Sequence, residues 1–202
     1  MNYCIYGAAS DSIDPKYIAA GEALGRALAR RGHGMVFGGG ANGLMGAAAR
    51  GMTETGGVEI IGVAPRFFDV DGVLYPACTR MIWTDTMRER KQIMEEMADG
   101  FIITPGGLGT MDEFFEILTL KQLGSHGKPV VIYNVDHYYD KLKEFLQQMA
   151  DRQFMRRASL GLFHLEEDPE SLAAWIEKQD EALVDLAEMK NINWTLKKGG
   201  TS

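Results

Sequence analysis

The sequence has few cysteines and histidines, and none of them forms a pattern that would hold a metal ion. Its two cysteines, Cys4 and Cys78, lie far apart in the 202 residues and outside any CxxC pattern. A disulfide framework or a zinc site is therefore not expected, and a reducing compartment fits this cysteine usage. The four histidines are scattered without the spacing of metal ligands. We therefore predict no metal site.

The sequence also lacks an excess of positive charge and any long hydrophobic run. Its formal net charge is −7 at pH 7 and its pI is about 5.1, which argues against a nucleic-acid or anionic-membrane partner. The first ten residues, MNYCIYGAAS, contain no basic segment followed by a long apolar core, so no signal peptide is expected. No apolar run is long enough to span a bilayer. These absences predict a cytoplasmic protein.

What the sequence does contain is a regular alternation of short apolar runs and helical patterns. Strands that are apolar on both faces and alternate with helices predict a parallel sheet covered on both sides. We therefore expect a single-domain α/β fold with a Rossmann-like, doubly wound parallel sheet. The strands are predicted at 3–7, 34–40, 59–65, 81–85, 100–105 and 128–134, with a last apolar piece at 161–167, and the helices at about 15–31, 43–57, 86–98, 109–123, 137–150 and 169–180.

Glycine is abundant, with 24 residues, and two clusters directly follow predicted strands. The first cluster is GGGANGLMG at 38–46 and the second is PGGLGT at 105–110. Open parallel sheets bind ligands beyond the carboxyl ends of their strands. Glycine lets an anion approach backbone N–H groups, and the helix that follows presents unpaired N–H groups and the positive end of its dipole. Tight turns alone would explain one such loop, but two of them favour a ligand site.

The two loops also restrict the kind of ligand. Neither is a Walker P-loop, because no Gly-Lys-Ser/Thr follows, and the first lacks the acidic residue that a dinucleotide site would have. A mononucleotide or a sugar phosphate therefore fits better than NAD. We predict a nucleotide-monophosphate-binding domain over residues 1–184 and a weakly ordered tail over 185–202.

Glu113 is the first candidate for chemistry. It lies three residues after Thr110, in the predicted first turn of the helix at 109–123, and so close to the expected phosphate. The Thr110 hydroxyl suits either helix capping or a phosphate oxygen. The T-x-x-E spacing is also that of a capping box, so a purely structural role for Glu113 is open. Asp112 points about 100° away on the helix and does not pair with Glu113.

A second group of charged residues lies in TMRERKQIMEEM, at 86–97. Arg90 falls beside a face of methionines, where a cation commonly just extends its charged end into solvent. The same helix runs into the strand before the second glycine loop, which also places Arg90 within reach of that loop's ligand. Arg88 and Lys91 share another face of the helix, and we predict Arg88 as a substrate-binding residue.

These residues together resemble a known family. The segment MRERKQIMEEMADGFIITPGGLGTMDEFFE, with GGGANGLMG upstream, is similar to the Lonely Guy family of cytokinin riboside 5′-monophosphate phosphoribohydrolases, many of which are labelled lysine decarboxylases. The resemblance spans roughly residues 1–155 and implies that Arg90 and Glu113 are catalytic. It also implies that both glycine loops bind the substrate, through Gly39, Gly40, Gly43, Met45, Gly106, Gly107, Gly109 and Thr110.

The resemblance further implies an assembly and a reaction. Family members are homodimers or larger, with active sites completed by the neighbouring subunit, and they use no metal or redox cofactor. The expected reaction, part of cytokinin biosynthesis, is hydrolysis of the N-glycosidic bond of a purine nucleoside 5′-monophosphate to the free base and ribose 5-phosphate. AMP and cytokinin-type nucleotides are the expected substrates. Glu113 would stabilise positive charge on the ribose and activate water, and Arg90 would orient Glu113.

Two other functions stay open on the residues alone. A Rossmann-like carrier would hold a nucleotide, or a cofactor that contains one, between the same two loops without turning it over. An amino-acid decarboxylase would need a lysine for pyridoxal phosphate, and neither Lys91 nor Lys121 has a context that supports this role. The acidic residue that follows the second glycine loop, at its spacing from Arg90, favours the hydrolase.

Overall fold

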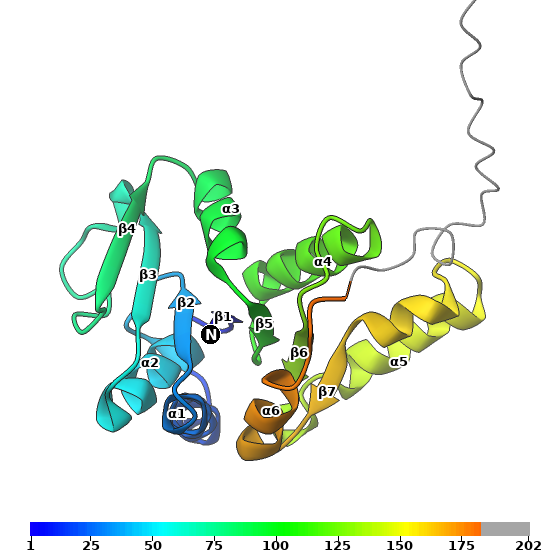
Figure 1. The fold of residues 1–202 in the computed structure, drawn as a ribbon, viewed down its shortest axis with the longest axis horizontal. Helices are drawn as coiled ribbons and strands as arrows, with labels where there is room; N and C mark the ends of the chain where they lie inside the picture. The colour runs from blue at the N-terminus through cyan, green and yellow to red at the C-terminus, as the bar shows by residue number, and fades with distance from the viewer. Residues whose placement is uncertain (183–202) are drawn as a thin grey trace, which may run out of the picture.

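A parallel sheet of seven strands runs through the centre of the structure in the order β4-β3-β2-β1-β5-β6-β7 (Figure 1). The computed structural model describes residues 1–182, so the tail predicted at 185–202 lies outside the described residues. Every strand pairs in parallel with its neighbours, which confirms the predicted doubly wound α/β sheet. The strands are β1 (Asn2–Tyr6), β2 (Gly34–Phe37), β3 (Ile60–Pro65), β4 (Arg80–Thr84), β5 (Gly100–Ile103), β6 (Val130–Tyr133) and β7 (His164–Glu166).

Helices cover both faces of the sheet because the strands are apolar on both sides. In β1, Tyr3 and Ile5 join the core on one face, and Cys4 and Tyr6 join the core on the other, as alternation along a strand requires. Helices α1, α2 and α6 pack on the first face, and α3, α4 and α5 pack on the second. The helices are α1 (Pro15–Arg30), α2 (Gly43–Thr55), α3 (Met87–Met97), α4 (Leu108–Gln122), α5 (Asp140–Asp151) and α6 (Pro169–Ile176).

Most predicted element boundaries agree with the structure within a few residues, and two segments differ. The helix predicted at 137–150 is preceded by a short 3₁₀ turn, η2 (Val135–His137), in which φ is 51° at Asp136 and 59° at His137. A left-handed backbone there prevents a continuous helix, so α5 starts at Asp140. The helix predicted at 169–180 ends as α6 at Ile176. Among residues 1–182, no helix is both long and apolar enough to cross a membrane.

The order of the strands reverses between β1 and β5. The chain builds outward from β1 through β2 and β3 to β4, and then returns to place β5 on the other side of β1. The loops that follow these two strands lie against each other, since the Ala8 N–H donates to the Pro105 carbonyl oxygen at 2.9 Å. The carboxyl edge at such a reversal is where open α/β sheets bind ligands.

Two glycines allow α1 and α2 to approach closely beneath this edge. A Cβ on Gly25 would lie 2.0 Å from the Ala48 carbonyl oxygen, and one on Gly51 would lie 2.1 Å from the Glu22 carbonyl oxygen. Both contacts are with backbone, which cannot rotate aside. The close packing therefore fixes α2, and with it the first glycine loop, against α1.

We expect Gly25→Ala to lower the free energy of unfolding by about 1–2 kcal/mol, because the added methyl forces α1 and α2 apart by more than alanine gains in helix propensity. Urea unfolding followed by circular dichroism measures the change. Gly161→Ala is the control, because no atom lies within 4 Å of a Cβ at that position. Equal stabilities of the two variants would show that the helix pair accommodates the methyl group.

Candidate active site

Arg90 and Glu113 form a buried ion pair at the carboxyl edge of the sheet. The Arg90 Nη1 lies 3.4 Å from the Glu113 Oε1, and the two side chains are only 9% and 12% exposed. The Arg90 Nε donates to the carbonyl oxygen of Val63, within β3, at 3.1 Å. Arg90 therefore does not extend into solvent beside the methionines. The structure brings together the two residues that the sequence predicts to be catalytic.

The pKa of Glu113 reflects its burial. Burial raises the pKa of the carboxyl from 4.5 to about 7, while the charge and the hydrogen bond of Arg90 hold it down. A carboxyl group with this pKa exchanges a proton easily at neutral pH, which suits a general base or acid. The environment of Glu113 therefore resembles that of a reacting group more than that of a surface carboxylate.

The structure excludes the capping box. Helix α4 begins at Leu108 with Gly107 as its N-cap, so Thr110 is the third helical residue and Glu113 the sixth. No acidic residue lies in the first turn, and the expectation that Glu113 would lie there is wrong. A capping box would need Thr110 as the N-cap and a helix that begins at Met111. The helix instead begins at Leu108, which places Glu113 in the second turn, where it faces Arg90. Thr110 is buried, and its hydroxyl oxygen lies against Gly106, where a Cβ would be only 2.1 Å from that oxygen.

The first turn of α4 is open to an anion. Its N-cap makes no side-chain hydrogen bond, and no described residue accepts from the N–H groups of Leu108, Gly109 and Thr110. A Cβ on Gly107 or Gly109 would meet no atom within 4 Å, so the backbone of the turn is accessible. Unpaired N–H groups and the positive end of the helix dipole favour a phosphate at this place.

The first turn of α2, after the first glycine loop, is not open in the same way. The Gly43 N–H donates to the Asp11 Oδ1 at 2.8 Å, and the Leu44 N–H donates to the Ala8 carbonyl oxygen at 2.9 Å. Gly43 has a φ of 65°, and a Cβ there would lie 2.1 Å from the same carbonyl oxygen. The expectation that both helices present unpaired N–H groups to a ligand is therefore correct for α4 and wrong for α2, where the protein's own carboxylate occupies the position.

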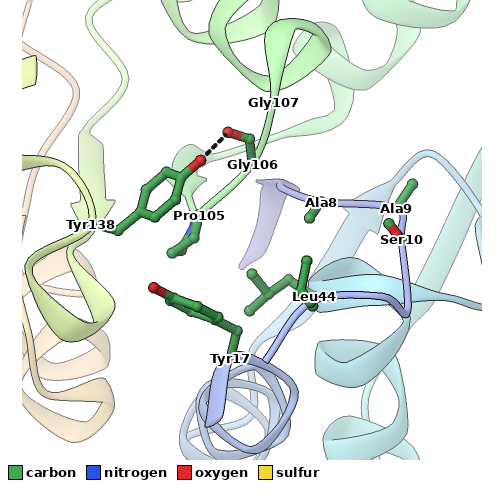
Figure 2. Close-up of a pocket in the computed structure, with 10 residues that line it drawn as sticks. Ala8, Ala9, Ser10, Tyr17, Leu44, Pro105, Gly106, Gly107 and Tyr138 are labelled. Atoms are coloured by element: carbon green, nitrogen blue, oxygen red, sulfur yellow. Dashed lines mark hydrogen bonds between the residues drawn. The ribbon is translucent and has the colours of Figure 1, made fainter. Parts of the chain in front are cut away.

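One hollow, of about 280 Å³, lies beside the first turn of α4. Figure 2 shows Tyr17 and Tyr138 on one side of it and Leu44 and Ala8 on the other. The Tyr138 hydroxyl donates to the Gly106 carbonyl oxygen at 2.9 Å, which links the segment before α5 to the second glycine loop (Figure 2). This contact fixes the backbone of the loop just ahead of the open amides.

A second hollow, of about 290 Å³, lies on the side of Arg90. The long loop between β3 and β4 forms part of its wall and is joined to the first glycine loop, because the Tyr75 N–H donates to the Gly39 carbonyl oxygen at 2.8 Å. Ala9 lines both hollows and so separates them. The remaining lining residues are Gly38, Gly40, Asn42, Met45, Phe68, Gly72, Val73, Leu74, Met87 and Arg90.

Four of the nine predicted binding residues line one of the two hollows, with Gly106 and Gly107 at the first, and five line neither. Gly40 and Met45 line the second hollow, and Gly39 makes the turn beside them with a φ of 76°. Arg88 is exposed and lines neither hollow, so its predicted contact with the substrate stays a prediction. Lys91 pairs with two carboxylates of α4 that are not Glu113.

Several residues of the site carry no signal in the sequence. Asp11 accepts a hydrogen bond from the first residue of α2, which lies 32 positions later in the sequence. Tyr138 holds a loop that lies 32 positions earlier. Phe68 enters a hollow from a loop without periodicity. Contacts of this kind depend on the order of the strands, which places distant segments side by side.

Comparison with known proteins gives consistent results. A family model described as "Possible lysine decarboxylase" matches residues 45–176. A protein of Rhodococcoides fascians named cytokinin riboside 5′-monophosphate phosphoribohydrolase is 38% identical over 145 residues, covering 71% of this chain and 73% of the relative. LOG2 of Arabidopsis thaliana, which has the same name, is 35% identical over 152 residues, covering 75% and 71%. The molybdenum cofactor carrier protein of Chlamydomonas reinhardtii superposes with a TM-score of 0.66 at 21% identity, covering 87% and 95%, a likeness of fold.

The burial of Glu113 predicts a stability that depends on pH. Its raised pKa means that the folded protein binds the proton more tightly than the unfolded chain does. The stability that this proton supplies is fully present below about pH 4.5 and is lost as the pH rises through about 7. Glutamine cannot ionise, so Glu113→Gln should gain little stability at pH 5 and up to about 3 kcal/mol at pH 8.

Urea unfolding at both pH values measures this difference. Asp112→Asn is the matched control, because it removes a carboxylate from the neighbouring position of the same helix, where the side chain is exposed. The same pH dependence in both variants would show that net charge, and not the burial of Glu113, causes the effect.

Proposed function

The chain belongs to the family described as possible lysine decarboxylases, and from this membership and its site we propose that it is a phosphoribohydrolase. It hydrolyses the N-glycosidic bond of a purine nucleoside 5′-monophosphate and releases the free base and ribose 5-phosphate. The names of the relatives at 35% and 38% identity give the reaction and the substrate class. The observation that carries the proposal is the buried pair of Arg90 and Glu113 beside the open first turn of α4.

The phosphate group of the substrate binds at the first turn of α4. The N–H groups of Leu108, Gly109 and Thr110 supply hydrogen bonds, and the absence of side chains at Gly106, Gly107 and Gly109 lets the phosphate oxygens approach. Binding energy at this remote group holds the ribose in place for reaction. Because Glu113 lies one turn further along the same helix, the ribose falls between the phosphate and the carboxylate.

The chemical step uses Glu113 in its ionised form. As the C1′–N bond breaks, its electron pair leaves with the base and positive charge develops on the ribose, which the carboxylate stabilises. A water molecule adds its oxygen to C1′ and passes a proton to Glu113. The departing base takes up a proton from solvent, and Glu113 returns its own proton to solvent, which restores the carboxylate. A guanidinium does not readily give up a proton, so Arg90 acts by holding Glu113 in position and by keeping part of it ionised.

The base lies in the second hollow, on the side of Arg90. Its wall of Met45, Phe68 and Met87 is apolar and suits the faces of a purine and a hydrophobic group attached to it. The proposal therefore includes both AMP and cytokinin-type nucleotides as substrates.

A carrier without turnover is the weaker reading. The similarity to the molybdenum cofactor carrier is 21% in sequence and concerns the fold alone. A carrier gains nothing from a buried carboxyl group with a pKa of about 7, whereas a hydrolase needs one. The hydrolase also agrees with the relatives of higher identity.

We further propose a cytoplasmic homodimer that binds no nucleic acid, in which each subunit borders the active site of the other. Helix α4 supports this assembly, because a row of apolar side chains along it is at least partly exposed, and Leu108 is 91% and Phe115 37% exposed. The row begins inside the phosphate-binding turn, so a second copy packed on it would reach the substrate. Its members are Leu108, Met111, Phe115 and Leu120. A net charge of −7 supports the absence of a nucleic-acid partner.

Incubation with AMP should yield adenine and ribose 5-phosphate, detected by liquid chromatography. Glu113→Gln should lower kcat by about 100-fold or more, because it removes the base and the charge that stabilises the ribose. Activity should rise with pH through about 7 as Glu113 ionises, and this limb should disappear in the variant. Glu96→Gln, at an exposed carboxylate of α3, should keep full activity. No base release from AMP, its isopentenyl derivative, GMP or CMP would contradict the function.

The assembly is tested by Phe115→Glu, which places a charge in the apolar row of α4. Light scattering after size exclusion should show a dimer for the unchanged protein and a shift toward monomer for the variant, with reduced activity in the monomer. Phe154→Glu, at an 85% exposed position outside α4, is the control and should stay dimeric. A monomeric unchanged protein with full activity would contradict the shared site.

A further inference from the structure

We infer that Gly38 is a positioning residue of this reaction, because its missing side chain leaves the space in which the Arg90 guanidinium lies. The inference rests on the proposed function, in which Arg90 holds the reacting carboxylate. Gly38 is the last residue before the turn of the first glycine loop and directly follows β2. Its role is exerted through Arg90, without contact with the reacting atoms.

The geometry at Gly38 is specific. A Cβ built there would lie 1.8 Å from the Arg90 Nη2 and 2.9 Å from its Cζ. Gly38 is not among the residues with positive φ, so the backbone itself does not require glycine. Its neighbours differ, since Gly39 has a φ of 76° and a Cβ on Gly40 would meet no atom within 4 Å. Of the three consecutive glycines, Gly38 is the one at which a Cβ would come within 3.0 Å of another side chain.

The guanidinium has little freedom to move away. Arg90 is 7% exposed, and its Nε is held by the Val63 carbonyl oxygen while its Nη1 faces Glu113. A methyl group at position 38 would push against the third nitrogen, Nη2. Displacing the group would lengthen the contact with Glu113, which is already 3.4 Å. Gly38, directly after β2, and Val63, within β3, therefore determine together where the guanidinium that holds the carboxylate lies.

Loss of the contact between Arg90 and Glu113 should change the pKa of Glu113 in a definite direction. Arg90 holds the pKa of Glu113 down against burial, so moving Arg90 away raises that pKa further and leaves less carboxylate at neutral pH. The other titratable groups near Glu113 do not move with Gly38. They are Lys91 from α3, Asp112 from α4, and Cys4 and Tyr6 from β1.

A direct contact between Gly38 and the substrate is the competing explanation, because Gly38 also lines the second hollow. A double-mutant cycle separates the two roles. Lysine at position 90 has no atom equivalent to Nη2, so the 1.8 Å clash is removed and the flexible end of the lysine has only a small shift to make for a methyl group on residue 38. If Gly38 acts through Arg90, Gly38→Ala should lower the activity only when position 90 is arginine. If it contacts the substrate, Gly38→Ala should matter in either background.

The experiment measures AMP hydrolysis by the unchanged protein, Gly38→Ala, Arg90→Lys and the double variant, across pH 5–9. We expect Gly38→Ala to lower kcat about 10- to 100-fold and to move the acid limb of the pH profile to higher pH. In the Arg90→Lys background the same change should cost less than about twofold. An equal loss in both backgrounds, or an unshifted acid limb, would overturn the inference.

A second measurement does not depend on activity. Carbon-13 NMR of protein labelled at its glutamate carboxyls follows the titration of Glu113, with the signal assigned from its absence in Glu113→Gln. The midpoint should rise in Gly38→Ala relative to the unchanged protein, and an identical midpoint would overturn the inference even if the substrate proved to be different. A fold lost in Gly38→Ala and regained in the double variant would support the clash with Arg90. A fold lost in both would contradict it.

Discussion

The buried contact between Arg90 and Glu113 joins three separate parts of the sheet edge. A buried cation is costly unless it is paired and hydrogen-bonded, and here the Val63 carbonyl oxygen and the Glu113 carboxylate share that task. The first partner belongs to β3, the second to α4, and Arg90 itself to α3. Satisfying one charge therefore determines how α3 is placed over the sheet, and the placement of α3 determines which way Glu113 faces.

The two glycine loops have similar sequences and different roles. In both, a strand ends in glycines and a helix begins, but Asp11 accepts a hydrogen bond from the first turn of α2 and no described residue does so at α4. A helix N-terminus that is already paired with a carboxylate has little attraction left for a phosphate. The first loop instead leaves space for the Arg90 guanidinium at Gly38 and forms part of the wall of the second hollow.

The fold was largely predictable from the sequence because strands buried on both faces form continuous apolar runs, as in GFII at 100–103. The pairing of Arg90 with Glu113 followed from a recognised motif, since no periodicity connects residues 23 positions apart. The turn of Glu113 was predicted wrongly because α4 starts at Leu108, whereas a capping box at Thr110 needs a helix that starts at Met111. Asp11 and Tyr138 were missed because their contacts exist only once the strands are ordered.

The pKa of Glu113 requires two opposing effects, and this explains why a buried arginine is present. Burial alone would leave the carboxyl group protonated at neutral pH and unable to accept a proton from water. Exposure would leave it ionised but a weak base, surrounded by water that competes for its charge. Arg90 stabilises the ionised form of Glu113 without opening the site to solvent. Because the balance depends on a contact of 3.4 Å, small changes in the support of the guanidinium act directly on the ionisation of Glu113.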